Sequence, residues 1–353
     1  MLTRWLFTCC FVVLTGLAQA QNAPVTTVSD FYKVSPGEVT IPVTVSGFNQ
    51  IGAISLNLEY DPAVLTFMQG DMNSMLSGMF AIGNNLLPSG MRSLAIGWFG
   101  DAQSLSDGAT LINLKFNFLG GTTNLSWFDD GASCEYTDAA YNALNDFPTD
   151  CHYVNGIVTS EKCLNLNFLL EGLYNPGIHM MGSALGDVSG PCEDGISDFS
   201  LVELRSAADY SNIVFSGSDI NLSMTGEARV LVPQTLSSNY YITVRHRNSI
   251  ATVSAVPVSF AGPIINYNFT DQQSKAFGSN MIQMADGKWA FFSGDVTQDG
   301  AVDTGDMSPV DNDAAAFASG YLATDVNGDG MVDTADITLI DNNAATFTGS
   351  LTP

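Results

Sequence analysis

The sequence predicts a mainly β protein that ends in a small α-helical module. Short alternating or apolar runs, broken by turn residues, fill most of the chain, whereas the last sixty residues change to an aspartate-rich repeat. Charged residues make up only 13% of the composition and Gly contributes 33 residues, a balance typical of exported β-rich proteins. A length of 353 residues indicates more than one module.

The N-terminus has the features of a secretory signal. Arg4 precedes an apolar run over residues 5–17, and Ala18-Gln19-Ala20 then offers small residues for cleavage. An anchoring helix would need about 20 apolar residues, more than this run supplies. We therefore expect residues 1–20 to be a signal peptide and the mature protein to be secreted, extracellular or held at the cell surface, with no membrane span.

The charge balance excludes some partners. A formal net charge of −25 repels nucleic acid and anionic membranes. Cations, neutral sugars and other proteins remain as expected partners.

Four cysteines follow the signal, and an even number in an exported chain without a CxxC pair favours disulfides. Proximity in sequence favours Cys134 with Cys151 and Cys163 with Cys192. Four cysteines allow three connectivities, so the pairing stays open.

Residues 24–160 form the first predicted β module. Its short strands and lack of helical period indicate an antiparallel β-sandwich or barrel. Period two assigns the inward faces to Val39, Ile41, Val43 and Val45, to Leu56 and Leu58, and to Leu114, Phe116 and Phe118.

Residues 161–292 give a second predicted β-sandwich. Within it lies a basic and aromatic cluster in an otherwise acidic chain, which could stack on a sugar and hydrogen-bond to it. The alternative is a set of ordinary alternating strand residues, with the histidine packed against a neighbour. The cluster consists of Tyr240, Tyr241, Arg245, His246 and Arg247.

Residues 293–353 contain an internal repeat with a period of 30 residues, eleven aspartates and no basic residue. Acidic runs are usually disordered. Here the spacing is fixed, a glycine stands at the sixth position of each loop, and apolar residues follow at helical intervals.

Each repeat has the oxygen spacing of a Ca²⁺-binding loop, in which a hard cation is wrapped by about 6 to 8 oxygens. Val302 and Val332 should point into a small core, and Thr297 makes the first loop the weaker binder. We expect two Ca²⁺ ions and a fold that requires them, because the carboxylates otherwise repel one another. The predicted ligands are Asp295, Thr297, Asp299, the Ala301 carbonyl, Asp303 and Asp306, and Asp325, Asn327, Asp329, the Met331 carbonyl, Asp333 and Asp336.

Two such loops, each followed by a short helix and an aromatic residue, resemble a type I dockerin, the calcium-dependent plug of cellulosome-like assemblies. The resemblance implies partner contacts from the tenth and eleventh loop positions and the following helix. The matching residues are Thr304, Gly305, Met307, Val310 and Asp311, and Thr334, Ala335, Ile337, Ile340 and Asp341. Gly305 and Ala335 depart from the hydroxyl pair common in that family.

The first module resembles a cohesin, the socket that dockerins enter. The resemblance rests on VSPGEVTIPVTVSGF (34–48), IGAISLNLEYDPAVLTF (51–67), the run from Leu94 to Trp127, and VNGIVTS (154–160). It implies a jelly-roll β-sandwich with a dockerin platform on one sheet face, for which Asn57, Glu59 and, more loosely, Trp98 are candidates. The segment between Cys134 and Cys151 is an elaboration that could decorate or block this platform. The second module, through LNLNFLLEGLYN (164–175), LVELRSA (201–207) and YYITVRHRNS (240–249), resembles a β-sandwich found beside dockerins in secreted Bacteroidetes proteins.

Three functions compete. An enzyme is disfavoured, since no GxSxG or HExxH motif occurs and the three histidines lie far apart. A carbohydrate-binding surface protein is the alternative, with Trp98, Phe99, Trp127 and Phe128 as candidates, although alternation places one of each adjacent pair inward. The favoured interpretation is a secreted non-catalytic adaptor of a polysaccharide-degrading, cellulosome-like system, whose partners carry dockerins and cohesins.

Overall fold

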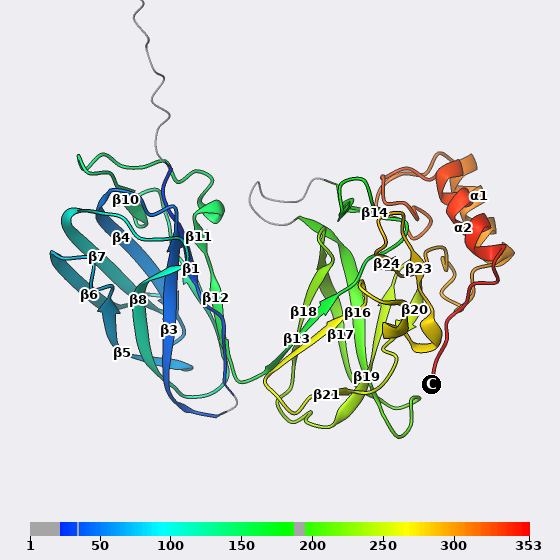
Figure 1. Ribbon diagram of the computed structural model, residues 1–353, viewed down its shortest axis with the longest axis horizontal. Helices are drawn as coiled ribbons and strands as arrows, with labels where there is room; N and C mark the ends of the chain where they lie inside the picture. The colour runs from blue at the N-terminus through cyan, green and yellow to red at the C-terminus, as the bar shows by residue number, and fades with distance from the viewer. Residues whose placement is uncertain (1–21, 34, 187–194) are drawn as a thin grey trace, which may run out of the picture.

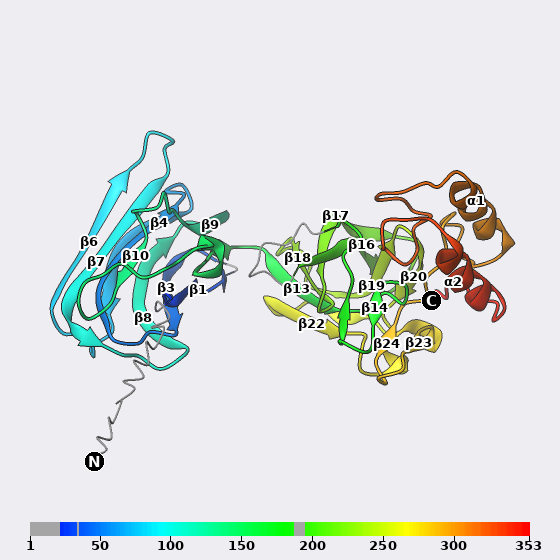
Figure 2. The same ribbon diagram turned by 90° about the horizontal axis from the view of Figure 1, so that it is seen from above.

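A computed structural model describes residues 22–33, 35–186 and 195–353. Two β domains follow each other along the long axis, and two helices lie beyond the second domain (Figure 1; Figure 2 shows the same arrangement from above). The predicted signal peptide falls outside the described residues. Among the helices of the described residues, none combines the length and apolar character that a membrane crossing needs.

The N-terminal domain is a sandwich of two sheets. The first sheet has the strand order β11 (Tyr153–Val154), β1 (Val25–Val28), β3 (Gly37–Ser46), β8 (Ala109–Phe118) and β5 (Leu65–Met72). The second has the order β2 (Phe31–Tyr32), β12 (Gly156–Thr159), β9 (Thr122–Trp127), β4 (Ile51–Tyr60), β7 (Arg92–Gln103) and β6 (Met79–Leu86), with β10 (Glu135–Thr137) paired to β4. A 3₁₀ turn spans Thr149–Cys151.

The core of this domain follows the period-two prediction. The inward residues predicted on β3, β4 and β8 are all buried between the two sheets. Tyr60 and Phe116 pack edge to face, with ring centroids 5.2 Å apart. The predicted β-sandwich is confirmed.

The second β region differs from the predicted sandwich, because its long strands join one sheet. The order is β20 (Ser249–Val253), β19 (Asn239–His246), β16 (Ile196–Ser206), β17 (Ile213–Ser223), β18 (Glu227–Val232), β13 (Lys162–Asn167) and β22 (Ile264–Asn268), with β21 (Val258–Ser259) paired to β19. The core also takes residues from two hairpins, β14–β15 (Tyr174–Asn175, Met180–Met181) and β23–β24 (Ile282–Gln283, Trp289–Ala290). Ala276, which lies between the 3₁₀ turns Gln273–Lys275 and Phe277–Ser279, also belongs to this core. β22 forms one edge of this sheet, in parallel beside β13.

The C-terminal repeat folds into two loop-helix units with helices α1 (Thr304–Ala315) and α2 (Thr334–Ala344). Each helix begins with a capping box made by two aspartates of the repeat. Val302 and Val332 are buried as predicted, and Ile250 from β20 joins the same small core. Each loop bridges to the segment that follows the other repeat's helix, Ala301 to Gly349 and Met331 to Ser319.

Polar contacts fasten the repeat to the middle domain. The Arg247 guanidinium donates to the Asp325 carbonyl over 2.9 Å, and its Nε donates to buried Asp198 over 3.0 Å. On α2, the Asn343 amide donates to Glu171 over 2.6 Å. The second loop therefore lies against the middle domain.

The predicted cysteine pairings are wrong. Cys134 and Cys163 are buried free thiols. Cys151 is disulfide-bonded, so its partner is neither of these two, and Cys192 lies outside the described residues. Neighbouring positions in sequence were a poor guide, because Cys134 is enclosed in the N-terminal core and Cys163 begins the middle sheet.

Candidate functional site

The outer surface of strands β4, β7 and β6 is here called the open face. The strand register aligns small outward residues in rows, because the alternate positions are turned into the core. A Cβ atom added at Gly97 would meet nothing within 4 Å, so the surface above this residue is open. Its small residues are Ser55, Ala81, Gly83, Ala95 and Gly97.

One end of the open face is apolar. Phe99 is 54% exposed and Met79, its cross-strand partner, is 75% exposed. Tyr141 from the 134–151 segment stacks on Phe99, with ring centroids 5.0 Å apart. In the same segment, β10 pairs with the edge of β4. The elaboration thus decorates one end of the face and leaves its centre open.

The other end is polar. Asn57 and Glu59 both lie on β4 and are half-buried, and the Ser93 hydroxyl donates to the Asn57 carboxamide oxygen. Both predicted platform residues are therefore on this face. Trp98 is not, since it is 2% exposed and belongs to the core.

The aromatic residues considered for sugar stacking do not form a row. Phe99 points outward whereas Trp98 points inward, as alternation requires. Trp127 is half-buried and its indole nitrogen donates to the Val154 carbonyl over 3.1 Å, while Phe128 is 43% exposed.

The first acidic loop buries the carboxylates of Asp295 and Asp306 and leaves Asp299 and Asp303 exposed. Asp295 is 2% exposed; its Oδ2 accepts from the Gly300 amide over 3.2 Å, and its buried Oδ1 has no partner. Asp306 is fully buried and accepts from the amide and the hydroxyl of Thr297, each over 2.9 Å. Burial and the adjacent Asp306 charge raise the pKa of Asp295 to about 6.

The second loop repeats this arrangement. Asp325 accepts from the Gly328 and Gly330 amides, and Asp336 accepts from the Val326 amide over 2.7 Å. Burial raises the pKa of both carboxyls. The carboxylates of Asp325 and Asp336 are thus held inside the second loop, as those of Asp295 and Asp306 are inside the first.

These residues fit a hard cation. Within residues 22–33, 35–186 and 195–353, no group of three or more His, Cys, Asp or Glu side chains is already gathered to hold a metal. The donor set is nevertheless all oxygen, and the unpartnered Asp295 Oδ1 is a buried acceptor that a cation would satisfy.

The predicted partner-binding residues of the repeat separate into three groups. Thr304, Gly305, Asp311, Thr334, Ala335 and Asp341 are exposed. Met307 and Ile337 are half-buried against the small core. Val310 and Ile340 are fully buried, which corrects their assignment, because a side chain inside the core cannot contact a partner.

The basic and aromatic cluster of the middle domain is structural. Tyr240 and His246 are buried, and His246 Nε2 lies 2.9 Å from the Asp198 carboxylate. Arg247 binds the same carboxylate and reaches into the C-terminal repeat. Sequence reasoning missed Asp198, since one aspartate on a strand carries no signal until its partners are placed.

Comparisons with known proteins agree with the cohesin resemblance of the first domain. The family model for the cohesin domain matches residues 25–144. The N-terminal sandwich is therefore a cohesin domain. No curated protein matches the chain.

Solved structures that match the chain include several cohesins. The sixth cohesin of Acetivibrio cellulolyticus scaffoldin B, in complex with a Cel5 dockerin mutant, is 17% identical over 39% of this chain and 99% of its own, with a TM-score of 0.31. A non-cellulosomal cohesin from Archaeoglobus fulgidus is 18% identical over 38% and 89%, with a TM-score of 0.29. A type I cohesin–dockerin complex from Clostridium thermocellum is 12% identical over 40% of this chain and 94% of its own, with a TM-score of 0.32.

Proposed function

We propose that the protein is a secreted, non-catalytic adaptor that receives a dockerin on the open face of its cohesin domain. The observation that carries this proposal is the sheet face with open space at Gly97, an apolar end at Phe99 and a polar end at Asn57 and Glu59. In support, the Acetivibrio and Clostridium cohesins are recorded in complexes with dockerins.

The chemistry of the face suits a docking module. The alanine, glycine and serine side chains at the centre of the open face are short, so a partner can bring its own side chains close to the sheet backbone. Apolar surface at Phe99 and Met79 supplies the area whose burial drives association, at roughly 25 cal/mol per Å². Asn57 and Glu59 add polar groups that fix orientation.

The C-terminal repeat would serve as a second, calcium-dependent connector that enters a cohesin on another protein. Asp295, Asp299, Asp303 and Asp306 would hold one ion with Thr297 and the Ala301 carbonyl, and the twin residues of the second loop would hold another. Bound Ca²⁺ would offset the repulsion between these carboxylates. The exposed residues at the start of each helix, Thr304 and Thr334 among them, then face a partner.

An adaptor with these two connectors raises the effective concentration of the proteins it joins. In a polysaccharide-degrading, cellulosome-like system those would be enzymes and scaffold proteins outside the cell. No catalytic step is assigned to this chain, because a cohesin domain is an interaction module.

The test is a calorimetric titration of the whole protein with a panel of type I dockerins in Ca²⁺. Saturable one-to-one binding by at least one dockerin supports the proposal. A correctly folded protein that binds no member of the panel contradicts it.

A further inference from the structure

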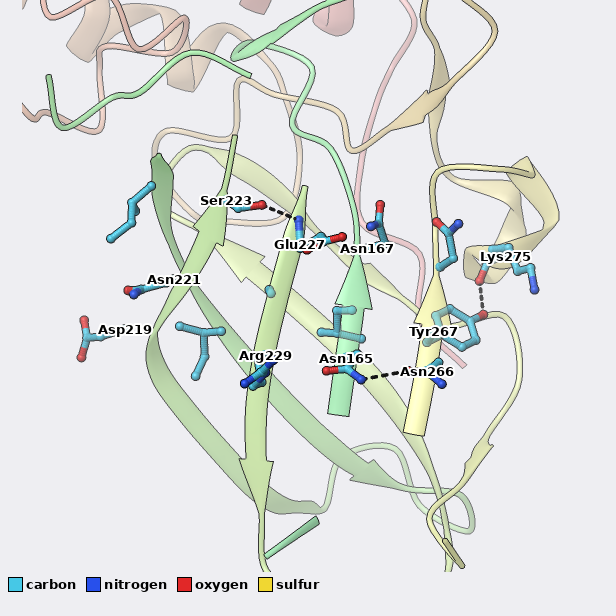
Figure 3. A pocket seen from close by; sticks show the side chains of 15 residues that line it. Asn165, Asn167, Asp219, Asn221, Ser223, Glu227, Arg229, Asn266, Tyr267 and Lys275 are labelled. Atoms are coloured by element: carbon cyan, nitrogen blue, oxygen red, sulfur yellow. Dashed lines mark hydrogen bonds between the residues drawn. The ribbon is translucent and has the colours of Figure 1, made fainter. Parts of the chain in front are cut away.

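A broad groove crosses the middle domain on the solvent side of β17, β18, β13 and β22. Figure 3 shows Asn221, Arg229, Asn165 and Asn266 lying across these four strands. Its volume is about 1070 Å³, at the upper end of what ligand pockets reach, roughly 300–1,000 Å³. Such a size suits an extended ligand better than a single small molecule.

The groove is lined by carboxamides, and the strand register places them in rows. Asn165 stands opposite Arg229 on one side and Asn266 on the other. Two residues along, Asn167 stands opposite Glu227 and Asn268. The intervening residues, such as Leu166, are turned into the core. Five asparagines contribute to the lining: Asn165, Asn167, Asn221, Asn266 and Asn268.

Several of these carboxamides have hydrogen-bonding capacity to spare. Asn165 donates to the Asn266 oxygen over 2.9 Å, and the Asn268 oxygen accepts from the Thr270 amide over 2.8 Å. Among the described residues, no partner engages the side chains of Asn167 and Asn221. Each free carboxamide offers donors and an acceptor side by side. Neighbouring hydroxyls of a sugar present the same combination.

The charges in the groove cancel. Asp219 and Glu227 are balanced by Arg229 and Lys275, in a chain whose net charge is −25. Arg229 is also paired with Asp30 of the cohesin domain, over 2.5 Å, so the groove and its edge together carry about one net negative charge. A groove of this kind has no reason to select a strongly charged ligand of either sign.

Apolar anchoring is weak here. The one aromatic side chain in the lining, Tyr267, is half-buried, and its hydroxyl donates to the Lys275 carbonyl over 2.5 Å. A protein or peptide partner would ordinarily need a buried aromatic or aliphatic centre. Hydrogen bonding is what the groove offers.

We propose that this groove binds a neutral, hydroxyl-rich oligosaccharide chain. The carboxamide rows would bond successive sugar hydroxyls across four strands spaced about 4.8 Å apart. Recognition through hydrogen bonds without ring stacking implies modest affinity. The site is independent of the open face and of the calcium loops, so it would hold the adaptor against a polysaccharide while its connectors remain free.

The experiment is a calorimetric titration of the whole protein with neutral hexasaccharides, namely cellohexaose, xylohexaose, mannohexaose and laminarihexaose. Oligogalacturonate serves as the anionic comparison, and a strand-forming neutral hexapeptide tests the alternative occupant. We expect at least one neutral hexasaccharide to bind with a micromolar to millimolar Kd.

The double variant N167A/N221A should weaken that binding by roughly 30-fold, since two lost hydrogen bonds at about 1 kcal/mol each total about 2 kcal/mol. The matched control N239A removes an exposed asparagine of β19 outside the groove and should leave binding unchanged. Circular dichroism confirms that both variants fold. No binding by any neutral hexasaccharide, preference for oligogalacturonate or the peptide, or equal binding by both variants would overturn the proposal.

Discussion

Replacing Asp198 with asparagine should loosen the attachment of the C-terminal repeat to the middle domain. Asp198 is fully buried and accepts hydrogen bonds from His246, Arg247 and the Tyr321 hydroxyl, the last over 2.6 Å. Arg247 in turn stacks on the Tyr321 ring and bonds the Asp325 carbonyl. One carboxylate thus organises the contact between the two parts.

The free energy that Asp198 contributes to this contact follows from the shift of its pKa. Burial alone would raise this pKa, but the hydrogen bond and charge of His246 and the charge of Arg247 outweigh burial and lower it from 3.8 to about 2. This gap corresponds to about 2 kcal/mol at 1.36 kcal/mol per pH unit, or roughly 30-fold in an opening equilibrium. The stabilisation is present above the unfolded-state value and is lost as pH falls from about 4 through about 2.

Hydrogen exchange of the whole protein provides the assay. In Asp198→Asn at neutral pH, amides of α2 and of the segment around Tyr321 should exchange up to about 30-fold faster than in the wild type. Asp271→Asn, at an exposed position of the same domain, should leave exchange unchanged. Equal protection in wild type and Asp198→Asn would refute the reasoning, as would a difference that persists unchanged below pH 2.

Three further outcomes are expected. Removing Ca²⁺ with a chelator should lower the thermal midpoint of the repeat, and restoring Ca²⁺ at about 100 times its Kd should raise the free energy of unfolding by about 2.7 kcal/mol. Hydrogen exchange of the α1 and α2 amides measures the change. Equal exchange with and without Ca²⁺ would exclude calcium ligation. Cys134, whose pKa burial raises to about 12, and Cys163 should resist Ellman's reagent at pH 8 until the protein is unfolded, when both thiols react; absence of thiols after unfolding would show that they are paired. Phe99→Ala should weaken dockerin binding by about tenfold or more, measured by calorimetry, because an exposed aromatic in an apolar contact is a typical hot spot; unchanged affinity would place the contact elsewhere.

Local pattern was enough to predict much of the fold. Alternation placed Val39 and Leu114 in the core, and the 30-residue period located both loops and their helices. Alternation also indicated that one member of the Trp98–Phe99 pair would point inward, although which one depends on the register of β4, β7 and β6.

The errors came from properties that depend on distant contacts. Cys134 lies in the core of the N-terminal domain and Cys163 is buried on β13 of the middle domain, and both are free thiols. Val310 and Ile340 were assigned to a partner surface, whereas the helical period turns them inward. The asparagine groove was not predicted, because it depends on β22 pairing beside β13, about a hundred residues away in the chain.

The central claim is that the open face of the cohesin domain receives a dockerin, and a single bulky side chain tests it. Gly97→Arg projects into the empty space at the centre of the face, so the domain should fold normally. Thr40→Arg, at an exposed position of β3 in the opposite sheet, is the matched control. Calorimetry with a dockerin that binds the wild type should show binding abolished by Gly97→Arg and retained by Thr40→Arg; full binding by a folded Gly97→Arg protein would contradict the account.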